Sequence, residues 1–124
     1  MRKILIAAAA LLLCAAPAVA ADDVMAGFYG NTTISTGGMA EIHTQYKADH
    51  TFAFTASAML IHLSGKGTWK IDSNGQLCRD IENPPAGVPN PSCGPIAAHR
   101  VGDTWTVTGK DGSVRTVTLK AGIQ

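Results

Sequence analysis

Short alternating segments between closely spaced turn residues constrain this chain more than any other feature. Thr or Ala alternates with Phe over 51–55, Thr alternates with Trp and Val over 104–108, and β-branched residues dominate 114–119. Such a pattern suits a pleated strand with one buried face. Turn residues recur at intervals typical of small β-sandwiches and barrels, roughly 8–12 residues. The sequence therefore predicts an all-β fold, a small antiparallel up-and-down β-barrel, with a β-sandwich as the alternative.

Two dipeptides mark hairpins within this pattern. Asn74-Gly75 and Asp111-Gly112 suit tight turns that need positive φ, so hairpins are expected over 70–77 and 107–114. The run 58–63 lacks alternation and is compatible with one helical turn, but its short length between breakers favours a strand. Strands are expected near 25–34, 39–47, 51–57, 58–64, 67–72, 76–81, 96–100, 104–109 and 113–120.

The first twenty residues read as an export signal. A basic start, an apolar run over 4–16 and a small-residue cleavage motif ending at Ala20 are typical of a secretory signal peptide. A membrane-spanning helix needs about 20 apolar residues, so this run is too short for one. We expect a signal peptide over 1–20, a single β-barrel domain over 21–124, and no membrane span after cleavage. The expected location is the periplasm, with the extracellular space as the alternative.

Removing the signal changes the charge balance. The remaining 124 − 20 = 104 residues carry 10 − 2 = 8 Lys and Arg against 9 Asp and Glu, a net charge of −1. This balance disfavours a nucleic-acid partner recruited by bulk charge. A chain of this length makes one core only, which excludes a multidomain protein. The oligomeric state is left open by the sequence.

Two cysteines remain once Cys14 leaves with the signal. Cys78 and Cys93 are an even pair in an exported domain, which predicts a disulfide. The closed loop of about 15 residues implies roughly 3 kcal/mol of stabilisation. Close pairs of zinc ligands and a haem-attachment motif are absent, so no metal and no cofactor are predicted.

The segment 83–95 is rich in proline and glycine. Prolines cannot donate to a β-ladder, so the segment is expected to form an irregular loop outside the sheet, tethered by Cys93. Such a loop is either a binding lid or an insertion kept from fraying. The second interpretation is favoured.

The strand rhythm, Gly67-Thr68-Trp69 and Arg115 on the last expected strand together resemble the small calycin-like barrels, which include lipocalins and avidins. The tripeptide looks like the Gly-x-Trp of that group. The resemblance implies an up-and-down barrel with a ligand cavity at one end. It also implies that Arg115 stacks on Trp69 or Trp105 at the closed end as a cation–π pair.

Three polar residues share one face of the expected strand 39–47. Glu41, His43 and Gln45 alternate with Ile42, Thr44 and Tyr46. If the second set packs outward, the first set lines a polar cavity, where Glu41 and His43 would serve as a general acid/base pair. His62 interrupts an apolar run and is a third catalytic candidate; its alternative interpretation is a core histidine bonded to the backbone.

Aromatic and histidine side chains supply the expected ligand-binding set. It comprises Tyr29, His43, Phe52, Phe54, His62 and Trp69. The favoured function is therefore a secreted barrel that binds a small apolar or amphipathic ligand without catalysis. The alternatives are a cofactor-free barrel isomerase, cyclase or lyase, and an envelope interaction protein such as a hydrolase inhibitor that presents the loop 83–95.

Overall fold

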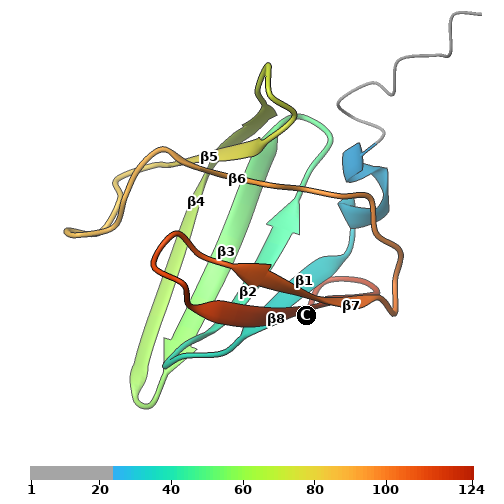
Figure 1. Cartoon of the computed structure of the whole chain (residues 1–124). Helices are drawn as coiled ribbons and strands as arrows, with labels where there is room; N and C mark the ends of the chain where they lie inside the picture. The colour runs from blue at the N-terminus through green and yellow to red at the C-terminus, as the bar shows by residue number, and fades with distance from the viewer. Residues whose placement is uncertain (1–23) are drawn as a thin grey trace, which may run out of the picture.

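The computed structural model describes residues 24–124, and the export signal expected over 1–20 lies outside the described residues. It is all-β and antiparallel, which confirms the predicted fold class (Figure 1). The elements are a 3-10 turn η1 (Ala26–Phe28) and the strands β1 (Thr32–Thr36), β2 (Glu41–Tyr46), β3 (Thr51–Ala58), β4 (Ile61–Ile71), β5 (Leu77–Ile81), β6 (Ser92–Gly94), β7 (Thr104–Thr108) and β8 (Val114–Lys120). Within residues 24–124, no helix has the length and apolar character to cross a membrane.

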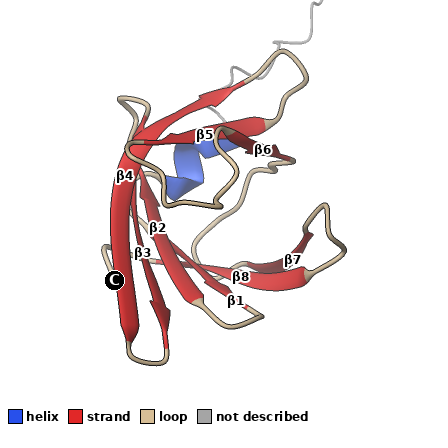
Figure 2. Ribbon diagram, turned by 90° about the vertical axis from the view of Figure 1, so that its left-hand side faces the viewer, coloured by secondary structure: helices blue, strands red, loops and turns tan. Residues whose placement is uncertain are grey.

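The eight strands form one curled sheet with the order β6-β5-β4-β3-β2-β1-β8-β7. This is the ring order of an eight-stranded up-and-down barrel interrupted between β6 and β7. β1 joins the first six strands to the last two by pairing with β8, from Thr32 opposite Lys120 to Thr36 opposite Thr116. The sheet is thus a half-barrel with a gap between its two edge strands (Figure 2).

The two ends of the half-barrel differ. At the closed end, which contains η1 and the turn 47–50, large side chains fill the curl. At the open end lie the turns 37–40, 59–60 and 109–113. The core cluster at the closed end consists of Met25, Phe28, Tyr46, Phe52, Trp69, Leu77 and Leu119. The phenyl ring of Phe28 packs edge-to-face against Tyr46 and Trp105, so η1 covers the closed end (Figure 2).

Both predicted hairpins are confirmed, and four strand predictions need correction. The expected strands 58–64 and 67–72 are one continuous strand, because Gly65 and Gly67 fit into β4 and leave room for neighbouring groups. The segment 25–34 starts with the 3-10 turn instead of a strand. The apolar run 96–100 forms no strand and crosses the concave face as coil.

The Cys78–Cys93 disulfide is formed, as predicted. It joins β5 to β6, and the two cysteines lie opposite each other in the ladder. The expectation that all of 83–95 stays outside the sheet is therefore wrong for Ser92–Gly94, which pair with β5. These residues follow the last proline-containing turn, so their N–H groups are available to the ladder.

The motif tryptophan and Arg115 lie at opposite ends of the half-barrel. Trp69 is buried at the closed end, where its Nε1 donates to the Lys47 carbonyl oxygen at 3.0 Å. Arg115 instead bonds to the β1–β2 turn at the open end. The stacking expected on Trp69 does not occur, and Trp105 stacks on His99 instead.

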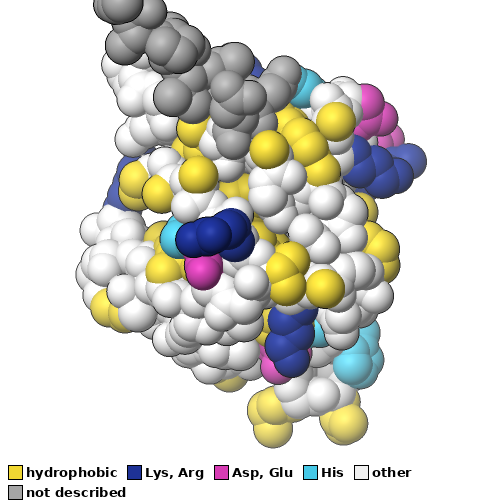
Figure 3. All heavy atoms as spheres, turned by 90° about the vertical axis from the view of Figure 1, so that its right-hand side faces the viewer, with side chains coloured by type: hydrophobic (Ala, Val, Ile, Leu, Met, Phe, Trp, Pro, Cys, Tyr) yellow, Lys and Arg dark blue, Asp and Glu magenta, His cyan; other side chains and the backbone are white. Residues whose placement is uncertain are grey.

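The tip of the β3–β4 hairpin exposes large apolar side chains. Met59 is 91% exposed and Leu60 is 96% exposed. Both occupy the two-residue turn, and Met59 has a φ of 54°, which is uncommon for a bulky residue. Figure 3 shows apolar side chains at the bottom of the molecule, the end where this hairpin lies in Figure 1.

Candidate functional site

The concave face of the half-barrel contains a hollow of about 560 Å³. This volume falls within the range usual for small-molecule sites, roughly 300–1,000 Å³. The hollow lies between the closed-end core and the open end, and its walls come from β1, β2, β5, β7 and β8. Its lining residues are Phe28, Thr33, Ser35, Ile42, Thr44, Tyr46, Leu77, Arg79, Gly94, Pro95, Ile96, Ala97, His99, Trp105, Thr106, Val107, Thr108, Arg115 and Val117.

On β2 and β8, strand alternation decides which side chains reach this hollow. Ile42, Thr44 and Tyr46 are alternate residues of β2, and all three line it. On β8, Arg115 and Val117 do the same. Side chains become smaller or polar away from the core, as at Thr44 and Ser35, and this change leaves the space unfilled beyond Tyr46.

The segment 95–103, which links the two edge strands, supplies a further wall. It crosses the concave face (Figure 1), and Ile96, Ala97 and His99 line the hollow. The imidazole of His99 stacks on Trp105 of β7, with ring centroids 3.5 Å apart and planes at 6°. This stack holds the middle of the segment on the sheet, and two backbone hydrogen bonds with Leu119, one from the Gly102 N–H and one to the Asp103 carbonyl oxygen, hold its end.

Asp103 anchors the same segment through its carboxylate. One oxygen accepts from the Arg100 backbone N–H at 3.0 Å and lies 3.4 Å from His99 Nδ1. These contacts, the Arg100 N–H first, lower the pKa of the Asp103 carboxyl below its usual value. The carboxylate therefore stays ionised at neutral pH and holds the turn that precedes β7.

Two guanidinium groups face the hollow from different elements. Arg79 of β5 donates from Nη1 to the Tyr46 hydroxyl at 3.3 Å. Arg115 of β8 donates from Nε to Ser35 Oγ at 2.6 Å and from Nη2 to the carbonyl oxygens of Ser35 and Ala40 at 3.0 and 2.6 Å. Its Nη1 donates to the Gly37 carbonyl. Arg115 thus fastens the β1–β2 turn to β8.

The expected Glu41–His43 pair forms, but it lies on the convex side of the sheet. His43 Nε2 is 2.6 Å from Glu41 Oε1, and the carboxylate-bearing side chain is 53% exposed. The alternate residues Ile42 and Thr44 face the hollow, so Glu41 and His43 point away from it. A second hollow, of about 490 Å³ near Lys47 and Glu82, does not include the pair either.

His62 lies outside both of these hollows. It is exposed on the β3–β4 hairpin, where its Nδ1 is 3.1 Å from Ser57 Oγ. The interpretation of His62 as a core histidine is therefore wrong. The side chain sits beside the exposed apolar tip, not beside the cavity-lining residues.

Most of the expected aromatic set belongs to the closed-end core or packs against it. Phe52 and Trp69 are buried, and Tyr29 and Phe54 pack against the same cluster. None of the four lines the concave hollow, although Phe52 reaches the second one. The exposed His50 stacks on Trp69 with centroids 4.1 Å apart.

Sequence reasoning missed the polar residues that do reach the concave hollow. Arg79, His99 and Trp105 line it together with Tyr46. One signal was available on the expected strand 39–47, where Tyr46 shares a face with Ile42 and Thr44. Arg79 carried no comparable signal in the sequence, because its strand is short.

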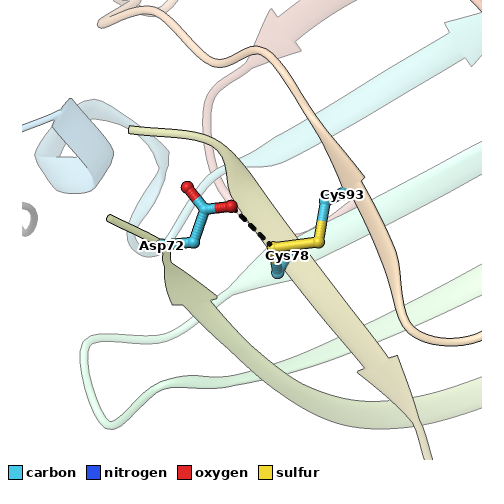
Figure 4. A group of neighbouring side chains, drawn as sticks. All are labelled: Asp72, Cys78 and Cys93. Carbon is cyan, nitrogen blue, oxygen red and sulfur yellow. Dashed lines mark hydrogen bonds between the residues drawn. A yellow bond between two sulfur atoms is a disulfide. The ribbon is translucent and has the colours of Figure 1, made fainter. Parts of the chain in front are cut away.

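One cluster has the residue types of a metal site. Asp72, Cys78 and Cys93 place their ligand atoms within 4.8 Å of one another (Figure 4). The two sulfurs are bonded to each other, so neither is a thiolate ligand. Asp72 Oδ1 already accepts from the N–H groups of Asn74 and Gln76, both at 2.9 Å. The cluster therefore consists of a disulfide beside a hairpin turn that the Asp72 carboxylate holds together.

The chain matches no protein-family model, no curated protein and no solved structure.

Proposed function

We propose that this protein is exported and holds a small apolar or amphipathic molecule in the concave hollow. One observation carries the proposal: a space of about 560 Å³ bounded by both apolar and polar side chains of the curled sheet. Clefts with apolar walls and a few convergent polar groups are the usual form of small-molecule sites. The hollow has both components, with Ile42, Ile96 and Val117 as apolar wall and Tyr46 and Arg79 as polar groups.

The export part of the proposal has two supports. The segment 1–20 has the features of a signal peptide. The Cys78–Cys93 disulfide suits an oxidising compartment, and the periplasm is the simplest one. Non-reducing mass analysis of the secreted chain tests both, because it should show cleavage after Ala20 and no free thiol. An uncleaved chain or a titratable Cys78 would contradict this part.

A filled hollow tests the binding part. Ala97 is exposed on the segment 95–103 and lines the hollow, so Ala97→Phe places a ring in that space without disturbing the core. The matched control is Ala121→Phe, the same change at an exposed site beyond β8. Binding is measured by the fluorescence of N-phenyl-1-naphthylamine, a neutral apolar probe.

We expect the probe to bind the wild type, to bind Ala97→Phe at least about tenfold more weakly, and to bind Ala121→Phe as it binds the wild type. Equal binding by all three proteins would place the probe elsewhere and contradict the proposal. Native mass spectrometry of protein from its own compartment adds a second readout. A retained, chemically unchanged small molecule supports binding, whereas turnover of that molecule favours the enzyme alternative.

A further inference from the structure

The charges around the concave hollow are unbalanced. Arg79 and Arg115 line it, and none of its lining residues is Asp or Glu. The third basic side chain of the lining, His99, already has the Asp103 carboxylate beside it. Among residues 24–124, the ion pairs involve Glu41, Lys66 and Asp103 with their partners, and neither arginine takes part. Both guanidinium groups are partly buried beside apolar side chains, where an opposite charge is screened less than in bulk water. The hollow therefore favours an anion from outside the protein.

The two arginines differ in what they can still bind. Arg115 donates four hydrogen bonds to Ser35, Gly37 and Ala40, which occupies four of its five N–H groups. It contributes a fixed positive charge at the open end and holds the β1–β2 turn. It has little capacity left for a ligand.

Arg79 keeps most of its donors. Among residues 24–124, the guanidinium makes one hydrogen bond, to the Tyr46 hydroxyl at 3.3 Å, which leaves four of its N–H groups. Since the hydroxyl oxygen accepts from Arg79, its own proton is available to another acceptor. The guanidinium and the hydroxyl thus form adjacent donors on the wall of the hollow, and a planar guanidinium binds carboxylate or phosphate oxygens in pairs.

Apolar side chains continue from these donors toward the open end. Ile42, Val107 and Val117 line the hollow between Arg79 at its inner end and the exposed rim. Val107 is itself 37% exposed. A ligand that fits this arrangement has a charged end and an apolar body.

We infer that the ligand is an anionic amphiphile, whose carboxylate or phosphate group binds Arg79 and the Tyr46 hydroxyl while its apolar chain lies along the wall of the hollow. The inference rests on the proposed binding function and adds the chemical class of the ligand. Arg79 is the anion-binding residue, and Arg115 supports it through its charge alone.

The test compares ligands that differ only in the head group. Decanoate, decyl phosphate and decanol, each below its aggregation concentration, are titrated by calorimetry against the wild type. Removing a charge-assisted hydrogen bond is expected to weaken binding by about tenfold to a hundredfold. We therefore expect at least one of the two anions to bind at least about tenfold more tightly than decanol. The anion that binds identifies the head group.

The variants locate the anion. Arg79→Gln should lower anion affinity to the level of decanol and leave decanol binding unchanged. Lys110→Gln, the matched loss of one positive charge in the exposed β7–β8 turn, should change neither. Tyr46→Phe removes only the hydroxyl, and it should weaken anion binding several-fold while preserving the buried ring; this variant serves if Arg79→Gln does not fold.

The outcomes separate the two proposals. Equal affinity for decanol and both anions overturns the anionic class but leaves the binding function standing. Anion affinity that survives both Arg79→Gln and Tyr46→Phe overturns the assignment of these residues. If none of the three amphiphiles binds, this inference is overturned, and the neutral-probe experiment with Ala97→Phe then decides the binding function by itself.

Discussion

Gly27 provides the sharpest test of how the hollow is built. It lies in η1 against the backbone of the segment 95–103. A Cβ atom at this position would sit 1.9 Å from the His99 carbonyl oxygen and 3.1 Å from the His99 carbonyl carbon. Gly27 does not have positive φ, so Gly27→Ala causes no backbone strain of its own. The effect of the substitution is therefore steric, and it acts on main-chain atoms that cannot rotate away.

The size of the effect follows from the distance. Ordinary contact begins near 3.4 Å, so η1 and the His99 backbone must separate by 3.4 − 1.9 = 1.5 Å. Overpacking of this kind typically costs about 1–3 kcal/mol, and a clash with backbone belongs at the upper end. Alanine also restricts the unfolded chain more than glycine does, which offsets about 0.4–1 kcal/mol of this cost. We expect a net loss of about 2 kcal/mol in the free energy of unfolding.

Urea denaturation followed by tryptophan fluorescence measures this loss. Gly94→Ala is the matched control, because Gly94 has no atom near the position of a new Cβ and no positive φ. Gly94→Ala should change the free energy of unfolding by about 1 kcal/mol at most. A Gly27→Ala protein as stable as the wild type, or less destabilised than Gly94→Ala, would refute the close packing of η1 on this segment. The separation should also weaken the stacking of His99 on Trp105 and hence ligand affinity.

Three further variants test other contacts. Replacing both Cys78 and Cys93 by Ala should lower the free energy of unfolding by about 3 kcal/mol in denaturant titrations, and a change below 1 kcal/mol would argue against the cross-link in the folded protein. Asp103→Asn should lower the melting temperature at neutral pH. Because folding lowers the Asp103 pKa below 3.8, its contribution is present above that pH and disappears as the pH falls through the folded-state pKa, so the two melting curves should converge in acid; a constant difference would contradict this. Met59→Asn should raise stability by about 0.5–1 kcal/mol, since Asn tolerates a φ of 54° better than Met, and a loss of stability would show that the exposed Met59 side chain makes a stabilising contact.

Local periodicity accounts for the elements that the sequence predicts well. The alternation in β3 and β7 and the turn dipeptides at Asn74 and Asp111 depend on neighbours only a few residues away. β6 depends on a partner across a long loop and on the disulfide, so its local sequence pattern does not predict a strand. The apolar run that begins at Ile96 looks like a strand, yet it serves as a wall without ladder partners.

The site was harder to predict because alternation does not say which face of a strand is concave. The pattern of β2 correctly separates Glu41 and His43 from Ile42 and Tyr46. Which set faces inward depends on the curl of the whole sheet and on its apolar core, both non-local properties. Arg79 reaches the hollow for the same reason, through its place opposite Trp69 in the ladder.

The pairing of β1 with β8 has a consequence for how fast the chain folds. Thr32 and Lys120 are partners although 120 − 32 = 88 residues separate them, whereas most other ladders join neighbouring segments through short turns. Forming this one ladder requires closure of almost the whole chain, and such non-local contacts slow folding to the millisecond-to-second range. The five-stranded meander β1–β5 and the hairpin β7–β8 are thus expected to form first as separate units. Substitutions in β1 that weaken its pairing with β8 should slow refolding most. Substitutions at the tip of the β3–β4 hairpin should leave the refolding rate nearly unchanged.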